Sequence, residues 1–216
     1  MNCFIILKLY VVRKFVGMRE ETRRAMERGQ HAEHSASGGV PRAFLSIVIM
    51  AALVVVITVL LRLFVFVPYE IPSGSMEDTI KTGDMVFSEK LSYYMHSPEY
   101  GDIVTFADPE VAGRVLIKRV IATEGQVVDL VDGKVYINGV ELDEPYTGHR
   151  PSYPLYRTAN GVDVSFPYTV PEGEIWVMGD NRTSSQDSRY FGSVKLSSVT
   201  GRAAFIYWPI RNVGFL

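Results

Sequence analysis

The chain has 216 residues, enough for one domain with a hydrophobic core plus an appendage. Its formal charge is −2, but residues 1–42 carry eight Lys and Arg against four Asp and Glu, whereas residues 68–216 carry thirteen against twenty. An acidic main domain argues against nucleic-acid binding, which uses a basic folded surface. The single cysteine, Cys3, excludes an intramolecular disulfide and a cysteine nucleophile in the main domain.

The first fifteen residues, MNCFIILKLYVVRKF, contain an apolar run that Lys8 interrupts and that is too short to span a membrane. Two interpretations remain open. This run lies at a membrane surface, or the true start of the protein is Met18. We treat residues 1–42 as a cytoplasmic N-terminal segment.

A long apolar run follows, from Ala43 to Leu61, with nineteen residues and no charge. As a helix it would extend roughly 28 Å, close to the thickness of a bilayer core. A buried core helix is disfavoured because the run has no amphipathic stripe, and a cleaved signal peptide is disfavoured because no small-x-small site follows. The sequence therefore predicts an uncleaved transmembrane anchor over residues 43–67.

The charges that flank this run predict its orientation. Five arginines lie in residues 19–42, whereas residues 68–87 contain Lys81 as their one basic residue. Positive charge favours the cytoplasmic side. We therefore expect a single-pass protein of the cell (plasma) membrane, with a cytoplasmic N-terminus and residues 68–216 outside.

Residues 68–216 alternate turn signals with short runs rich in Val, Ile, Phe and Tyr, a pattern that predicts β-strands. Asp132-Gly133 and Asn138-Gly139 are typical of two-residue hairpin turns. No long helical pattern intervenes, so a parallel α/β sheet is disfavoured. The predicted fold is mostly β: one N-terminal transmembrane helix followed by an antiparallel β catalytic domain. Within it, the proline-rich stretch Asp143–Val164 is expected to be a surface excursion. The strands are expected in DMVFSE, GDIVTFA, VLIKRVIAT, QVVDLVDGKVYINGVEL, EIWVMGD and GRAAFIYWP.

Several chemistries lack their motifs in this chain. There is no His-Glu-x-x-His, no Cys/His cluster, no phosphate-binding glycine loop and no Gly-x-Ser-x-Gly, so we expect neither a metal nor a cofactor. A Ser-His-Asp triad would need a histidine after the anchor, which excludes His31 and His34. Of the remaining two, His96 and His149, each lies in a polar stretch, where a solvated loop histidine is the favoured interpretation.

A lysine can activate a serine instead, provided that burial keeps the amine neutral. Of the five lysines after residue 68, Lys118 stands in an apolar strand, RVLIKRVIA, and the others lie in or near polar turns. The two-residue period places Leu116, Lys118 and Val120 on one face of that strand. Two interpretations remain open: a buried base, or an edge strand with Lys118 in solvent. A buried Lys118 that acts as a base would have its pKa lowered to roughly 7–9.

Four motifs occur in order after the apolar run: PSGSMEDTIKTGD, GDIVTF, IKRVIA and GDNRTSSQDSRYFG. Together they resemble type I (bacterial) signal peptidase, the membrane-bound Ser-Lys protease family that cleaves signal peptides from exported proteins. The resemblance covers about residues 68–209 and implies a mostly antiparallel β domain. The sequence departs from the family pattern at Ala122–Gln126, Thr183 and Ser184, none of which matches a catalytic position.

The resemblance implies roles for individual residues. Ser75 matches the nucleophile and Lys118 the general base. The Ser73 hydroxyl and the backbone N–H of Ser75 match the oxyanion hole, with Gly74 between them allowing a tight turn. Ser185 matches the serine that hydrogen-bonds and orients the lysine.

Further residues of the family pattern surround this pair. A charged group around the site is matched by Arg119, Asp180, Asp187 and Arg189, and Gly179 fits a turn against it. The substrate pockets are expected to be shallow, which would explain a preference for Ala-x-Ala. Their expected lining is Ile71, Pro72, Met76, Ile80, Leu116 and Ile117.

The implied function is an endopeptidase that cleaves N-terminal signal peptides of exported preproteins after small residues, through an acyl-enzyme. The expected partners are signal peptides of secretory preproteins and the lipid bilayer, with the protein-export translocon as a further candidate and no nucleic acid. Two alternatives are another Ser-Lys protease of related fold, such as a self-cleaving repressor, and a catalytically dead, membrane-tethered binding module.

Overall fold

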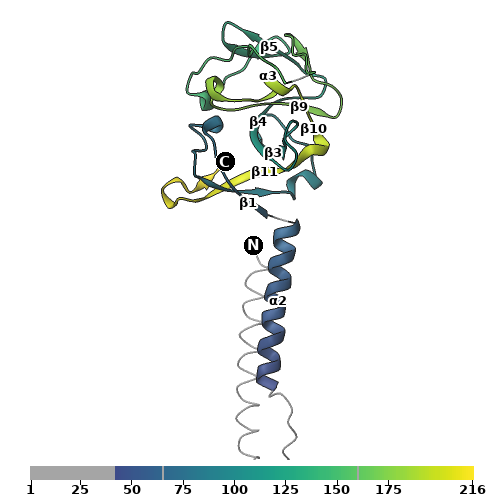
Figure 1. The fold of residues 1–216 in the computed structure, drawn as a ribbon, viewed down its shortest axis with the longest axis vertical. Coiled ribbons are helices and arrows are strands. Elements are labelled where there is room, and N and C mark those ends of the chain that lie inside the picture. Colours follow the sequence, from purple (N-terminus) through teal and green to yellow (C-terminus); the bar gives the residue numbers. More distant parts are fainter. Residues whose placement is uncertain (1–41, 65, 160) are drawn as a thin grey trace, which may run out of the picture. The chain divides into compact units, whose positions relative to one another are not determined.

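The structure is a computed structural model that describes residues 42–64, 66–159 and 161–216 (Figure 1). The choice between Met1 and Met18 as the start, and almost all of the predicted cytoplasmic segment 1–42, lie outside these residues. The predicted domain boundaries stay predictions.

One long helix, α2, runs from Arg42 to Phe64 and contains the apolar run noted above. Within the part of the chain that the structure describes, no helix meets the length and apolarity needed to cross a membrane. The predicted transmembrane anchor over residues 43–67 is thus not found. Phe66 and Val67, the last two residues of that predicted segment, begin strand β1, Phe66–Glu70, where they pair with Glu89 and Ser88.

The rest of the described chain is mostly antiparallel β-structure, as predicted. An eight-stranded sheet has the order β1-β2-β11-β3-β4-β9-β10, with β12 paired to β11. In Figure 1, β3, β4 and β9 lie together in the middle of this β-rich part. The strands after β1 are β2 Met85–Glu89, β3 Ile103–Ala107, β4 Val115–Thr123, β9 Glu174–Met178, β10 Val194–Lys195, β11 Val199–Trp208 and β12 Gly214–Phe215.

A four-stranded sheet has the order β7-β6-β5-β8. Its strands are β5 Val127–Val131, β6 Lys134–Ile137, β7 Val140–Glu141 and β8 Tyr168–Thr169. Asp132-Gly133 joins β5 to β6 and Asn138-Gly139 joins β6 to β7, and all four residues have positive φ, as the hairpin prediction requires. Both turn predictions are confirmed.

Short helical turns connect the strands. They include one four-residue α-helix, α3 Ser188–Phe191, whose N-cap Asp187 accepts a hydrogen bond from the Arg189 backbone N–H. The 3₁₀ turns are η1 Gly74–Met76, η2 Ser92–Tyr94, η3 Pro145–Thr147, η4 Arg182–Ser184, η5 Leu196–Ser198 and η6 Ile210–Asn212.

The two faces of β4 pack against different apolar clusters, as the two-residue period predicts. Ile117 packs in a cluster with Met76 and Ile80, beneath the Ser75 turn. Leu116 and Val120, on the opposite face, pack with Val104 and Phe106. The third cluster joins the two sheets and contains Ile121, Ala122, Val128, Val135, Ile137, Val170, Trp176 and Met178. Strand β4 therefore lies in the core of the domain, and the edge-strand interpretation of Lys118 is wrong.

Candidate active site

Ser75 lies in the 3₁₀ turn η1, which the adjacent residues hold against the core. Met76 and Ile80 have no exposed surface, and the Ile80 backbone N–H donates to the Met76 carbonyl at 2.9 Å. Because the Met76 side chain is packed in the core, the backbone of the turn has little freedom to rotate. The orientation of the Ser75 side chain is therefore restricted. Ser75 itself is 9% exposed.

Lys118 reaches Ser75 from the middle of β4. Its Nζ donates to Ser75 Oγ at 2.8 Å and to the carbonyl of Ile117 at 2.9 Å. The lysine is 3% exposed, and β4 is flanked by β3 and β9. The structure thus brings together the two residues that the sequence assigned to the dyad, 43 positions apart in the chain.

Burial lowers the pKa of Lys118 to about 8, because the interior disfavours the charged ammonium. The carboxylates of Asp187, Asp180 and Asp108 act in the opposite direction and keep this pKa from falling further. A free lysine amine near neutral pH is almost wholly protonated. A pKa near 8 leaves a useful fraction of neutral amine, which agrees with the predicted range.

Gly179 packs directly against Ser75 and Ser185. A Cβ at this position would overlap the Ser185 hydroxyl and the carbonyl oxygen of Ser75. Glycine is therefore required here for close approach rather than for an unusual φ. The sequence analysis expected Gly179 in a turn against the site; the structure shows close packing against the site directly after the end of β9.

Ser185 lies beside Lys118 in the family pattern, but its predicted hydrogen bond to the lysine is not formed. Its buried hydroxyl makes no hydrogen bond of good geometry among the described residues, although it lies near enough to Asp187 to help lower the pKa of that carboxylate. Lys118 Nζ donates to Ser75 and to the Ile117 carbonyl, while the Ser185 hydroxyl lies by the Asp187 carboxylate. This part of the site prediction is corrected.

Asn181 is a site residue that the sequence analysis missed. Its backbone N–H donates to the Ser75 carbonyl at 3.1 Å, and its side-chain amide donates to the Gly74 carbonyl at 3.0 Å. The loop after β9 thus holds the serine turn by two consecutive carbonyls. The polar motif GDNR was the available signal, but an asparagine in a polar turn has many local uses.

Arg119 and Asp180 form a two-pronged ion pair next to the dyad. Arg119 Nε donates to Asp180 Oδ1 at 2.8 Å and an Nη donates to Oδ2 at 2.6 Å. Thr79, four residues after Ser75, donates its hydroxyl to the same carboxylate at 2.5 Å. The pair ties β4, the loop after β9 and the segment after η1 together.

Asp187 and Arg189 form a second, fully enclosed pair. Both carboxylate oxygens accept from the Arg189 guanidinium at 2.9 Å, and Oδ2 also accepts from the Gly179 N–H at 3.0 Å. Burial alone would raise the pKa of Asp187, but Arg189 and these hydrogen bonds hold it below its ordinary value. All four charged residues predicted around the site are therefore paired within it.

The predicted pocket residues are not all available to a ligand. Ile71, Met76, Ile80 and Ile117 are buried in the core, with exposures of 3%, 0%, 0% and 9%. They support the Ser75 turn from below, because apolar side chains next to a turn gain more by packing than by lining an open groove. Among the six, Pro72 is exposed and Leu116 is half-buried.

Ser73 precedes the 3₁₀ turn in extended conformation, with φ −138° and ψ 155°, and it is exposed. Its predicted role in the oxyanion hole stays a prediction. His96 contacts the Ser97 carbonyl at 3.0 Å, and both His96 and His149 are exposed. Within the part of the chain that the structure describes, the side-chain hydrogen bonds of Ser75 and Lys118 involve no imidazole.

A serine hydroxyl hydrogen-bonded to a buried lysine with a pKa near 8, on an antiparallel β scaffold, defines the class of Ser-Lys hydrolases. Residues 42–208 match the family described as "Signal peptidase, peptidase S26". The chain belongs to this family and is a serine endopeptidase.

Curated relatives agree with this assignment. The chain is 39% identical over 175 residues to "Probable signal peptidase I-1" of Synechocystis sp., which covers 78% of this chain and 83% of that protein. It is 36% identical to "Signal peptidase I" of Bacillus caldolyticus, over 72% of this chain and 86% of that protein. A solved signal peptidase I structure from Enterococcus faecalis is 38% identical and covers 50% of this chain and 97% of its own, with a TM-score of 0.41.

Proposed function

We propose that this chain removes signal peptides from exported preproteins, with Ser75 as the nucleophile and Lys118 as the general base. The observation that carries the proposal is the 2.8 Å hydrogen bond from Lys118 Nζ to Ser75 Oγ, in a setting that lowers the lysine pKa to about 8. The relatives above are named as signal peptidases, and this chain has both residues of the Ser-Lys dyad.

In acylation, the Ser75 Oγ attacks the carbonyl carbon of the scissile peptide bond while its proton moves to neutral Lys118. The carbonyl oxygen becomes an oxyanion, which the Ser75 backbone N–H and the Ser73 hydroxyl are proposed to stabilise. The C–N bond then breaks, and Lys118 returns the proton to the leaving amine of the mature chain. Lys118 then takes a proton from water as the water oxygen attacks the ester carbon; the bond to Ser75 Oγ breaks, Lys118 returns the proton to Oγ, and the signal peptide leaves with a free carboxyl terminus.

The substrate is proposed to bind as an added strand beside the dyad. On one edge, residues Val115–Ile117 of β4 pair with β3. On the opposite edge, the pairing of β4 with β9 begins only at Arg119. That edge of Val115–Ile117 therefore makes no strand pairing among the described residues. An extended peptide laid there would run between β4 and the segment at Pro72 and Ser73. Shallow contacts favour small residues at positions −1 and −3 of the signal peptide.

Membrane attachment is a further part of the proposal. It is supported by the nineteen uncharged residues Ala43–Leu61 and by the excess of basic residues before them. A single pass with the N-terminus in the cytoplasm would put the dyad on the side where signal peptides emerge, next to the bilayer and the protein-export translocon. Alkaline carbonate extraction of membranes, followed by protease treatment of intact cells, tests attachment and sidedness.

Cleavage of a purified preprotein tests the proposal directly. The full chain in detergent is expected to release a mature protein whose N-terminal residue follows an Ala-x-Ala site, and Ser75→Ala is expected to release none. Efficient cleavage after Phe or Lys at position −1 would contradict the proposed binding of the substrate. Activity that survives in Ser75→Ala would contradict the proposed nucleophile.

A further inference from the structure

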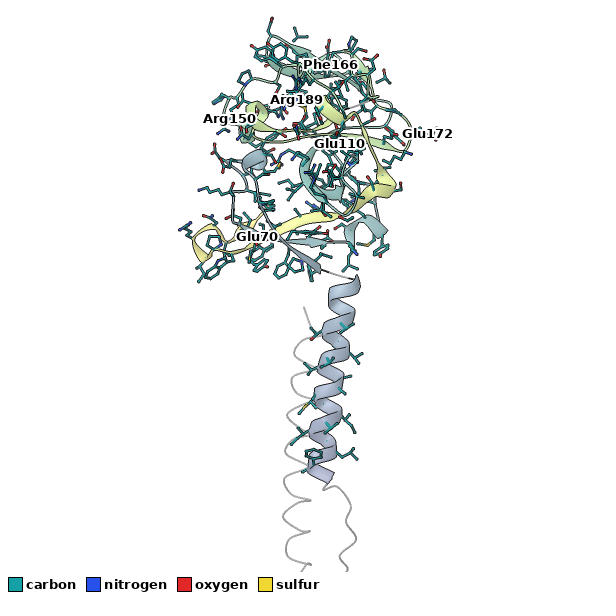
Figure 2. The ribbon with its side chains drawn as sticks, in the orientation of Figure 1. Glu70, Glu110, Arg150, Phe166, Glu172 and Arg189 are labelled. Atoms are coloured by element: carbon teal, nitrogen blue, oxygen red, sulfur yellow. The ribbon has the colours of Figure 1, made fainter. Side chains whose placement is uncertain are left out.

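The excursion after β7, to which the sequence assigned no role, contacts both segments that support the dyad. Arg150, labelled at the side of the fold in Figure 2, donates to the Asp78 carboxylate at 3.1 Å and to the Glu77 carbonyl at 3.4 Å, just after the Ser75 turn. From the same excursion, Glu144 contacts Arg182 in the loop after β9. The excursion therefore bridges the two sides of the site.

The contact between Glu144 and Arg182 is the stronger of the two. Glu144 Oε1 and Oε2 accept from two different Arg182 nitrogens at 2.5 and 2.8 Å, and the arginine side chain is fully enclosed. Arg182 also donates from Nε to the Gly179 carbonyl at 3.0 Å and from Nη1 to the Ser152 hydroxyl at 2.7 Å. Removing the carboxylate would leave a buried guanidinium unpaired, which is strongly unfavourable.

Tyr146, two residues after Glu144, contacts both the Glu144–Arg182 pair and Arg119, the residue next to Lys118. Its hydroxyl donates to Glu144 at 2.9 Å, and its ring lies 4.1 Å from the Arg119 guanidinium and 5.9 Å from that of Arg182. One aromatic ring thus packs on both guanidinium groups. Arg119 in turn holds Asp180 by two hydrogen bonds.

From these contacts we infer that Glu144 and Tyr146 are positioning residues for the Ser75–Lys118 pair, acting through Arg182 and Arg119. The inference rests on the proposed function of that pair. The route is continuous. Glu144 orients Arg182, Arg182 holds the Gly179 carbonyl, and Gly179 packs against the Ser75 carbonyl oxygen.

Loosening this route has a predictable effect on the lysine. The charged groups that act on Lys118 are Asp187, Asp180 and Asp108, and each of these carboxylates pairs with an arginine other than Arg182. The change is therefore one of water access. If the backbone at Gly179 moves away from Ser75, water reaches Lys118 and its amine is less desolvated. The pKa of Lys118 then moves from about 8 toward its ordinary value of 10.5.

The test compares Glu144→Gln with Glu141→Gln in the full-length chain, with a signal-peptide substrate. Glu141 lies on the adjacent hairpin in an exposed pair with Lys134 and serves as the matched control. For Glu144→Gln we expect kcat to fall by about tenfold or more, KM to stay within about twofold, and the pH midpoint of kcat/KM to rise above 8. Glu141→Gln should match the wild type in all three.

A second pair of variants covers the case in which Glu144→Gln does not fold. Tyr146→Leu removes the ring and should lower kcat and raise the pH midpoint, whereas Tyr146→Phe keeps the ring and should retain most activity. Lower thermal stability with unchanged kcat and pH midpoint in the folded variants would overturn the inference and make the excursion purely structural. Failure of the wild type to cleave would instead contradict the proposed function.

Discussion

Two strand lysines show how position in the fold decides what an amine can do. Lys118 on β4 and Lys134 on β6 each donate a short hydrogen bond from a β-strand. Lys118 is enclosed and hydrogen-bonds the Ser75 hydroxyl, and burial lowers its pKa to about 8. Lys134 is more than half exposed and pairs with Glu141 at 2.6 Å, and this contact raises its pKa. Desolvation, rather than the strand or the hydrogen bond, distinguishes the potential base.

The sharpest way to break this comparison is to replace each amine by a guanidinium. Lys118→Arg should reduce turnover by at least about 10³-fold at every accessible pH, because arginine stays protonated. Ser75→Ala should be equally inactive. Lys134→Arg keeps an exposed cation and should turn over like the wild type in a preprotein cleavage assay. An active Lys118→Arg enzyme would remove Lys118 as the base.

The pH profile separates the two lysines without mutation. Well below pH 8 the neutral fraction of Lys118 falls about tenfold per pH unit, so kcat/KM should rise about 50-fold from pH 6 to 8 and about twofold more above pH 8 before it levels off. The Lys134 amine, with its raised pKa, should leave no feature in this range. Initial rates in buffers of constant ionic strength measure the curve. A profile that stays flat from about pH 6 to 10 is incompatible with the assignment.

The close packing beside Ser75 can be tested at a glycine. Gly179→Ala should slow cleavage on the order of 30-fold, because the new methyl group displaces Ser75 or Ser185. Gly214→Ala is the control, since no atom lies within 4 Å of a Cβ built there. Circular dichroism confirms that both variants are folded. Equal activity of the two variants would show that the serine turn tolerates displacement.

The smallest expected effect is on stability. The folded pKa of Lys118 lies below its ordinary value of 10.5, so burial of the charged amine penalises folding in full below pH 8 and by less as the pH rises to 10.5. Lys118→Met should therefore raise the free energy of unfolding at pH 7 by up to about 3 kcal/mol, less the lost hydrogen bonds. The gain should shrink as pH rises from 8 through 10.5. Urea unfolding at pH 7 and pH 11 measures it, and Lys134→Met should show no such gain.

The sequence predicted much of the fold because its signals were local. Period-two runs and the Asp132-Gly133 and Asn138-Gly139 pairs identified strands and hairpins that need no long-range information. β1 was missed because Phe66 and Val67 continue the apolar run, and only pairing with β2 separates them from it. Two-residue strands such as β8 carry no periodicity of their own.

The candidate site divides in the same way. Ser75 and Lys118 were found because a motif and a lysine in an apolar strand are visible in the sequence alone. The pairing of Glu144 with Arg182 was not predicted, because the residues lie 38 positions apart and each is ordinary in its local context. Met76 and Ile80 were expected to line substrate pockets, but they are buried in the core. Their burial depends on packing against residues distant in the sequence, which no local pattern specifies.

The difference in exposure between the two lysines also bears on how the protein can be handled as a reagent. Amine-coupling chemistry reacts with accessible, unprotonated amines, so it should modify exposed positions such as Lys134 long before Lys118, which is 3% exposed. A surface-immobilised or dye-labelled preparation should therefore keep its dyad intact. The same enclosure means that a covalent probe must first bind beside β4 before it can meet Ser75, so recognition of its peptide portion, more than its electrophile, should decide which probes react.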